Sequence, residues 1–435
     1  QQPPTAAMSN EFSWEEIRSH TSPDSRWLVV DNAVYDVSRW AQKHPGGSRL
    51  LSHYAGQDAT EAFRAFHLDQ STVAKWLAPL RIGRVCSNDP ERLVAMRTDF
   101  ERLRKDAQAR GLFKPSLVFY ALMLAHIFAL EAIAYACLRF WGTGWLPYIV
   151  ALCLYATAQS QASWLQHDFG HLSVFHNRRW DGWLHQLTMS YFKGASAHWW
   201  KHLHYQHHSK PNVMNKDPDV RIQPLFVVGK TMPKETAANP KSPYVPYHFQ
   251  HRYFFAIGPP LLFPVYFQIA TFRHAISRRC YVDLACMALF FAKIVVLYRP
   301  LLGLGGAFLY YFLVRMIESH WFTWVSQSNH IPMEIEHDRA EPWLALQLHA
   351  TCDIEKSPFN DWFTGHLNFQ IEHHLFPTMP RHNYYKIQPD VQHLCQKYGI
   401  RHEIKPLWRA FCDVIGSLRH SGEIWHAAYH AHHMD

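Results

Sequence analysis

Three short stretches of this chain carry histidines at spacings that can place several imidazoles around one point. They read HDFGH at residues 167–171, HYQHH at 204–208 and QIEHH at 370–374. Residues three or four apart lie on the same face of a helix, so each stretch can present a converging set of ring nitrogens. Imidazole is a favoured ligand of iron, zinc, copper and nickel. One such stretch is compatible with chance among 32 histidines, but three of them beside long apolar segments predict a metal site.

The composition indicates a membrane protein with soluble parts. A chain of 435 residues is too long for one small domain, so two or three folding units are expected. The aromatic share is high, at 15%, and polar ends flank apolar blocks. The formal net charge of +8 comes from Lys and Arg residues that are scattered along the chain. This scattered pattern argues against nucleic-acid binding. It favours a basic face that lies against an anionic membrane leaflet or attracts an anionic carrier such as coenzyme A.

The cysteines indicate the redox state of the compartment, and the N-terminal residues indicate how the chain enters a membrane. The eight cysteines are dispersed and form no CxxC pair, which indicates free thiols in a reducing compartment. Residues 1–25 contain no apolar core long enough for a cleaved signal peptide. We therefore expect the chain to enter a membrane through internal segments.

Residues 11–86 predict a small α+β domain, which follows a tail at residues 1–10 that we expect to be disordered. Within this domain, two short strands flank an Asp-Asn turn at 31–32. The domain also contains His44-Pro45-Gly46-Gly47, and a second histidine, His67, lies 23 residues after His44. The two glycines allow the backbone to approach a flat ligand closely.

This N-terminal region resembles cytochrome b5. The resemblance rests on the HPGG motif, the AGQDAT run at 55–60 and the closing Ile82-Gly83. It implies that His44 and His67 are the axial ligands of a haem b, with Pro45, Gly46 and Gly47 beside it. Two imidazole ligands leave the haem iron without an open position, which favours electron transfer over oxygen binding. His53 is a weaker candidate for the second ligand.

The remainder predicts an α-helical integral membrane domain at 115–435, reached through a charged linker helix at 87–114. Apolar segments at 116–140 and 145–165 are long enough to span a bilayer, and a Gly-Thr-Gly turn joins them into a hairpin. With later segments they give about four transmembrane helices plus a cytosolic helical cap.

Three further apolar blocks, at 253–272, 282–298 and 301–325, set the topology. If all histidine clusters share one side of the membrane, the chain crosses it an even number of times between them. The Gly258-Pro259-Pro260 break makes 253–272 the block that we expect not to cross.

The region 115–435 resembles the membrane fatty acid desaturases, and most of all the animal front-end type that carries a fused cytochrome b5 domain. The matching stretches are WLQHDFGH at 164–171, QHHSKPN at 206–212 and GHLNFQIEHHLFP at 365–377. In front-end enzymes a glutamine opens the third stretch, where other desaturases have histidine. Gln370 occupies that position here.

The resemblance implies a di-iron site that activates O2. Gln370 is expected to coordinate through its carbonyl oxygen or to hold a water, while Asp168 and Glu372 are expected to orient imidazoles. Zinc is redox-silent, whereas iron activates oxygen when electrons are supplied, and the haem domain is a means of supplying them. The expected iron ligands are His167, His171, His204, His207, His208, His330, His373 and His374.

The implied reaction forms a cis double bond in a polyunsaturated acyl chain, carried as acyl-CoA, at the delta-5 or delta-6 position; delta-4 and delta-8 stay open. NADH is expected to supply electrons through a separate NADH–cytochrome b5 reductase, because the chain has no dinucleotide fingerprint. The glycines at 303–306 lie in an apolar block and predict helix packing or a break. We expect a multi-pass protein of the endoplasmic reticulum membrane with both termini in the cytosol.

Two alternative functions stay open at this point. A sphingolipid desaturase or a fatty-acyl hydroxylase shares this architecture and oxidant, and differs in how it holds its substrate. A membrane haem protein that only carries electrons, without catalysis, leaves the three histidine clusters unexplained. The histidines at 426–433 have no matching stretch and predict an exposed tail.

Overall fold

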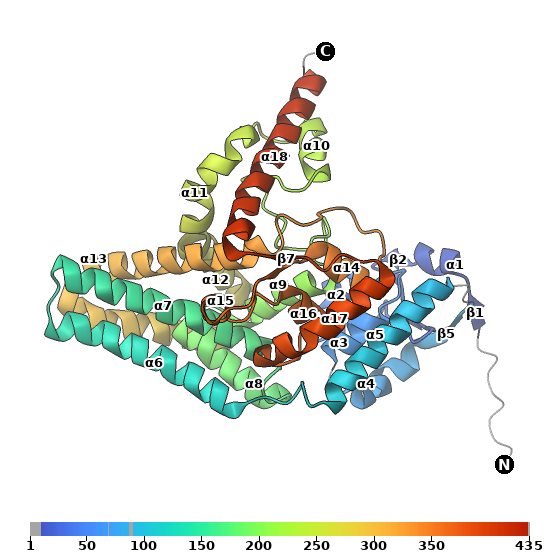
Figure 1. The fold of residues 1–435 in the computed structure, drawn as a ribbon, viewed down its shortest axis with the longest axis horizontal. Coiled ribbons are helices and arrows are strands. Elements are labelled where there is room, and N and C mark those ends of the chain that lie inside the picture. Colours follow the sequence, from blue (N-terminus) through green and yellow to red (C-terminus); the bar gives the residue numbers. More distant parts are fainter. Residues whose placement is uncertain (1–9, 68, 87–89, 434–435) are drawn as a thin grey trace.

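The computed structural model describes residues 10–67, 69–86 and 90–433. The predicted tail at residues 1–10 lies outside this range, except that Asn10 begins a strand. Figure 1 shows an N-terminal α+β unit at one end and long helices at the other, with short helices between them.

The N-terminal unit is built on a five-stranded sheet with the order β1-β5-β4-β3-β2. Strand β1 runs parallel to β5, and the other neighbours are antiparallel. Asp31 and Asn32 both have positive φ, as a two-residue turn between twisted strands requires. The strands are β1 (Asn10–Phe12), β2 (Thr21–Ser22), β3 (Ser25–Val30), β4 (Ala33–Asp36) and β5 (Arg81–Val85).

Four short helices complete this unit and confirm the predicted α+β fold. One small core, formed by Ile17, Val29, Val34 and Val85, packs α1 against the sheet. The helices are α1 (Trp14–Ser19), α2 (Ser48–His53), α3 (Thr60–Phe66) and α4 (Gln70–Leu77).

The helix predicted as a linker, α5 (Glu91–Ala109), packs along α17 (Tyr384–Tyr398) near the C-terminal end of the chain. The rings of Phe100 and Phe376 stack 5.5 Å apart, and Asp99 accepts a hydrogen bond of 2.6 Å from the Tyr398 hydroxyl. The connection between the two parts of the chain is therefore fixed to the body of the protein.

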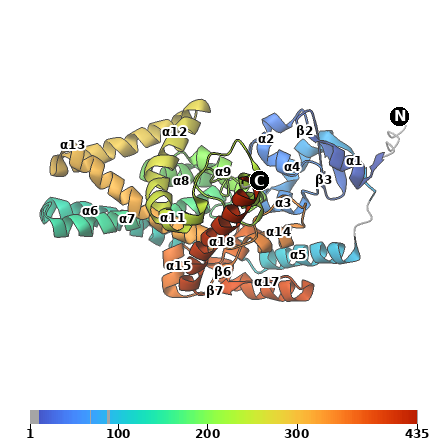
Figure 2. The same cartoon turned by 90° about the horizontal axis from the view of Figure 1, so that it is seen from above.

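The long helices form a four-helix unit at one end of the molecule. Helices α6 (Leu117–Phe140) and α7 (Trp145–Gly170) make the predicted hairpin, and α13 (Tyr281–Ser328) doubles back at Gly303 to give two arms (Figures 1 and 2). One apolar core joins α6, α7 and both arms, and includes Cys137, Tyr155, Ile294 and Tyr310. The predicted blocks at 282–298 and 301–325 are these two arms.

Within the described residues, three helical segments have the length and apolarity that a membrane crossing requires: Leu117–Phe140, Tyr247–Ser277 and Tyr281–Ser328. Helix α7 lies along α6 but is not among these three segments. Its second half is rich in glutamine, serine and histidine, which lowers its apolarity. Large apolar side chains of the four-helix unit face outward, among them Trp141 and Trp145 at the hairpin turn, 73% and 76% exposed. Such a surface suits lipid, with aromatic residues at its border.

The block at 253–272 is helical, but it is irregular where the sequence predicted a break. It consists of α11 (Gln250–Leu261), a π-helical turn at Leu262–Phe267 and α12 (Gln268–Ser277). Helix α11 stands across the direction of α6, α7 and α13 in Figure 1. This orientation is compatible with a position at the membrane surface, and the absence of a crossing here stays a prediction.

The central part holds the histidine stretches between the four-helix unit and the N-terminal unit (Figures 1 and 2). A two-stranded parallel ladder, β6 (Asp353–Ile354) with β7 (Ile404–Lys405), lies beside it. The histidines predicted to form a C-terminal tail lie instead on a long helix, α18. The helices not yet named are α8 (Arg178–His185), α9 (Ala197–Ser209), α10 (Thr231–Ala238), α14 (Trp343–Ala350), α15 (Pro358–Thr364), α16 (Gln370–Leu375) and α18 (Leu407–His433).

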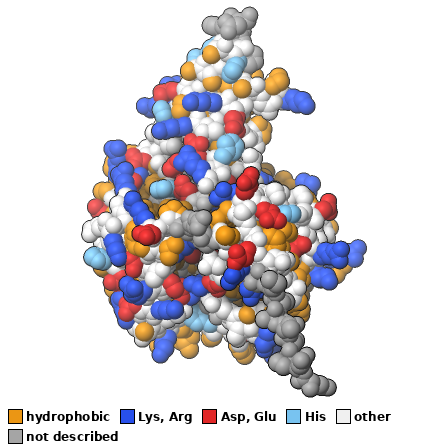
Figure 3. All heavy atoms as spheres, turned by 90° about the vertical axis from the view of Figure 1, so that its right-hand side faces the viewer, with side chains coloured by type: hydrophobic (Ala, Val, Ile, Leu, Met, Phe, Trp, Pro, Cys, Tyr) orange, Lys and Arg blue, Asp and Glu red, His pale blue; other side chains and the backbone are white. Residues whose placement is uncertain are grey.

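The face opposite the four-helix unit has the character of a water-exposed surface. Figure 3 shows Lys and Arg side chains interspersed with Asp and Glu over this face. The contrast between the two ends agrees with a membrane-embedded helical unit that carries a soluble part on one side.

The sharp turn of α13 depends on Gly303. Its φ of 70° and ψ of 173° lie in a region that essentially only glycine occupies, so Gly303→Ala should destabilise the protein by about 1–3 kcal/mol. No atom lies within 4 Å of the added Cβ, so the cost is backbone strain and not a clash. Gly305→Ala is the matched control, because a Cβ added at Gly305 also contacts nothing and the backbone there is helical. This substitution should leave the stability unchanged or raise it by up to ~1 kcal/mol. Thermal unfolding in detergent compares the two, and equal midpoints would contradict the turn.

Candidate metal centre

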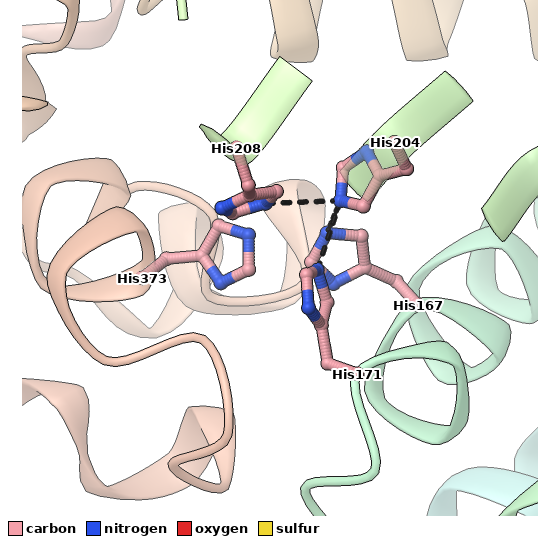
Figure 4. A group of neighbouring side chains, drawn as sticks. All are labelled: His167, His171, His204, His208 and His373. Carbon is pink, nitrogen blue, oxygen red and sulfur yellow. Dashed lines mark hydrogen bonds between the residues drawn. The ribbon is translucent and has the colours of Figure 1, made fainter. Parts of the chain in front are cut away.

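Five of the predicted ligands converge in one group, drawn in Figure 4. His167 and His171 come from the end of α7, His204 and His208 from α9, and His373 from α16. The Nε2 atom of His204 lies 3.0 Å from that of His167, 2.9 Å from that of His171 and 3.1 Å from that of His208. Three helices far apart in sequence thus direct ring nitrogens at one point.

These distances suit nitrogens that share a metal ion. One nitrogen carries at most one proton, so His204 Nε2 cannot form a normal hydrogen bond with all three neighbours. Two imidazole nitrogens held about 2.1 Å from the same metal at right angles are about 3 Å apart. The Nε2 atoms of His373 and His374 are moreover buried without a hydrogen-bond partner among the described residues. The group therefore fits a bound metal ion.

A second group, formed by His207, His330 and His374, adjoins the first. The ring of His330 lies 4.6 Å from that of His207 and 5.0 Å from that of His374. His374 also stacks on His208 of the first group, with ring centroids 4.1 Å apart. Gln370 joins this second group, because its Nε2 lies 2.8 Å from His330 Nε2. All eight predicted ligands therefore lie in two adjoining groups.

Hydrogen bonds on the outer nitrogens set the direction of four rings. Nδ1 of His207 donates to the Asp217 carboxylate at 2.9 Å, and Nδ1 of His330 donates to the carbonyl of Ala350 at 3.0 Å. In the neutral form of each ring, the bond places the single proton on Nδ1 and leaves the Nε2 lone pair directed into the groups. Outer partners of this kind commonly orient metal-binding histidines. In the same way, His374 Nδ1 donates to Gln347 and His373 Nδ1 pairs with the hydroxyl of Tyr384, both at 2.9 Å.

Electrostatics keeps most of these rings neutral. Burial lowers the pKa of His208, His373 and His374 well below the usual histidine value, and burial also lowers the pKa of His330 to about 3. His207 is the exception: burial lowers its pKa, but the nearby carboxylates outweigh this effect and raise it to about 9. A metal ion must displace the second proton of His207, so Asp217 then faces a metal-bound ring instead of an imidazolium.

The two carboxylates predicted to orient ligands have other partners. Asp168 lies 3.1 Å from Nε of Arg381, and Glu372 lies 3.1 Å from Nε2 of His402. The outer partners that the structure supplies are Asp217, Gln347 and Tyr384, which sequence reasoning missed. The only sequence signal for them was the position of Asp217 shortly after the second histidine stretch. His202 and His366, two further histidines close in sequence to the second and third histidine stretches, belong to neither group.

The N-terminal unit holds a second candidate site between His44 and His67. Their ring centroids lie 6.2 Å apart, which is the span of two metal–nitrogen bonds of about 2 Å each plus the two ring radii. His67 Nδ1 donates to the carbonyl of Phe63 at 2.8 Å, which leaves its Nε2 with a free lone pair. A Cβ on Gly46 would lie 3.0 Å from the His44 ring, so a glycine keeps this edge open. His53 is engaged elsewhere, because its Nδ1 contacts Ser209 Oγ at 3.0 Å.

The family profiles that match this sequence agree with a division into an N-terminal unit and a helical part. The sequence profile described as fatty acid desaturase matches residues 143–405, and the profile of the cytochrome b5-like haem/steroid binding domain matches residues 13–86. Among solved structures, the cytochrome b5 of Ostreococcus tauri virus 2 is 33% identical over 17% of this chain and 95% of its own length, with a TM-score of 0.17. The desaturase match covers more than half of the sequence, and the haem-domain match covers the N-terminal unit. The chain therefore belongs to the fatty acid desaturase family, as a membrane oxidoreductase with a cytochrome b5-like domain fused at its N-terminal end.

Proposed function

We propose that this protein is a front-end acyl-CoA desaturase. It introduces a cis double bond at the delta-5 or delta-6 position of a polyunsaturated chain, with electrons supplied through its own haem domain. The observation that carries the proposal is the convergence of eight imidazoles, most of them buried, into two adjoining groups, in a chain that also places His44 and His67 as a candidate haem-binding pair. The glutamine that opens the third histidine stretch supports the front-end assignment.

The residues present fit two iron ions. His167, His171, His204, His208 and His373 would hold one, and His207, His330 and His374 the other, with Gln370 beside His330. When bound, iron supplies the oxygen activation that removal of hydrogen from an unactivated methylene requires. The protein's own part is to keep most of these imidazoles neutral, to point four of them inward through Nδ1 hydrogen bonds and to exclude water by burial.

In the N-terminal domain, for which we propose the boundaries 11–86, His44 and His67 would hold a haem b. Burial lowers the pKa of His44 to about 4, so this ring is neutral and free to bind iron at physiological pH. Pro45, Gly46 and Gly47 keep the backbone close to the site. With no open position, such a haem carries single electrons.

The arrangement of the parts supports a position of both sites on the same side of the membrane. The N-terminal domain and the histidine groups lie on the same side of the four-helix unit (Figures 1 and 2), so an electron passes between them without crossing the bilayer. We propose a location in the endoplasmic reticulum membrane, with both termini in the cytosol. The proposed electron donor is NADH, through a separate NADH–cytochrome b5 reductase.

Product analysis tests the proposed reaction. Expression in a yeast strain without its own cytochrome b5, fed with a panel of polyunsaturated acids, should give a new double bond between an existing one and the carboxyl group. Mass spectrometry locates the bond. His44→Ala should abolish haem absorbance and most product, whereas His426→Ala, on the exposed part of α18, should match the wild type. A hydroxylated product, or full conversion by His44→Ala, would contradict the proposal.

The Asp217–His207 hydrogen bond should determine how firmly the second group holds iron. Asp217 is fully buried and also accepts from the backbone NH of Asn212 at 2.7 Å, so Asp217→Asn weakens a bond that the fold cannot replace. The expected loss of iron affinity is about 10- to 100-fold. Asp219→Asn is the control, because Asp219 is 44% exposed and lies 3.7 Å from the same nitrogen. Iron retained during graded chelator treatment measures the difference, and identical curves would argue against the ligand role of His207.

Gln370 should be essential for turnover. Gln370→Ala removes the amide beside His330 and should lose nearly all product, and Gln370→Asn should be similarly poor because its amide falls about one methylene short. Gln370→His should keep iron but lose much of the turnover, since a stronger ligand occupies the position. Iron content and product are measured on all three variants. Wild-type conversion by Gln370→Ala would show that this side chain only fills space.

A further inference from the structure

The N-terminal domain is joined to the second histidine stretch by buried hydrogen bonds. The hydroxyl of Tyr54 donates to the carbonyl of Ser209 at 2.7 Å, and His53 Nδ1 contacts the Ser209 hydroxyl at 3.0 Å. Lys216 donates to the carbonyl of His53 at 2.6 Å. Since Ser209 directly follows His208 at the end of α9, these bonds attach the domain to the helix that carries three of the proposed iron ligands.

A buried ion cluster reinforces this attachment. Asp338, in the segment between α13 and α14, accepts from Lys210, Lys216 and the side-chain amide of Gln57. Lys210 also donates to Gln57 Oε1 at 2.7 Å and lies 4.7 Å from the ring of Tyr54. The Lys210 side chain is only 1% exposed, so its charge depends on these partners. The cluster therefore fixes the relative position of the N-terminal domain and α9.

This position places aromatic rings in series between the two candidate metal sites. Phe66 directly precedes His67, and its ring lies 5.8 Å from the ring of Tyr205 on α9. The Tyr205 ring in turn lies 6.1 Å from that of His171, in the first histidine group. The Tyr205 hydroxyl donates to the carbonyl of Gly170 at 2.6 Å, which holds the ring against the end of α7.

We propose that Phe66 and Tyr205 form the route by which electrons pass from the haem domain to the histidine groups. The inference rests on the proposed function, in which His67 binds haem and His171 binds iron. Single electrons would tunnel through these two rings, neither of which is itself oxidised or reduced, so that a reduced haem would lose the electron and oxidised iron would gain it. No proton travels with the electron, because Phe66 has none to exchange and the Tyr205 hydroxyl stays bonded to a backbone carbonyl. The rings act as a close-packed path that replaces a water-filled gap.

Rapid photoreduction of the haem tests this route without any acyl substrate. Purified full-length protein with haem and oxidised iron is kept free of oxygen, and reoxidation of the haem is followed by its absorbance. Phe66→Leu and Tyr205→Leu should each slow reoxidation several-fold, and the ring-preserving variants Phe66→Tyr and Tyr205→Phe should slow it much less. Phe12→Leu is the matched control, because it alters a ring pair with Trp27 inside the same domain, and it should leave the rate unchanged.

Two further readouts separate the route from a loss of structure. The haem midpoint potential and the hydrogen exchange of α9, which the N-terminal domain covers, should be the same in Phe66→Leu and the wild type. A wild-type rate of haem reoxidation in both leucine variants would overturn the route. Slower reoxidation that occurs only together with faster hydrogen exchange of α9 would also overturn it. Equal reoxidation in wild-type protein with and without iron would instead overturn the proposed function, and the route with it.

Discussion

Neutral imidazoles, buried together with their lone pairs directed at one another, impose the constraint on which the rest of this structure depends. The Nε2 atoms around His204 lie 2.9 to 3.1 Å from it, too many for the protons available to them. Desolvated lone pairs at such distances are unfavourable until a cation occupies the space between them. Hydrogen bonds on the outer nitrogens hold four of the rings in these positions. The partners are the carboxylate of Asp217, the side chain of Gln347, the hydroxyl of Tyr384 and the carbonyl of Ala350.

Helix α9 shows how one element serves both candidate sites. His204 and His208 are four residues apart and share the face that contributes to the first group, while His207 faces the second group. Tyr205 and Ser209 are also four residues apart, and they form the neighbouring face, which contacts Phe66 and Tyr54 of the N-terminal domain. The spacing of the HYQHHS stretch thus combines metal binding with domain attachment. A shift of one residue along this helix would disrupt both.

Local spacing made much of the fold and of the site predictable. Histidines three or four apart indicated the converging groups, and paired turn residues indicated the hairpin at Asp31 and Asn32. The glycines at 303–306 indicated helix packing or a break, and the structure has a break at Gly303. What the sequence could not supply were contacts between distant segments. Asp168 and Glu372 lie next to ligands in the sequence, yet their carboxylates pair with Arg381 and His402. The partition of eight histidines into two groups, and the packing of α5 on α17, depend on the same long-range geometry.

The most direct test of the account is the metal content of the purified full-length protein. Iron is measured by elemental analysis and haem by its absorbance in the same sample, after weakly bound metal has been removed. If His44 and His67 hold one haem and the histidine groups hold two irons, the sample should contain about three iron atoms per haem. A ratio close to one, with the histidine groups empty or filled by zinc in active protein, would contradict it.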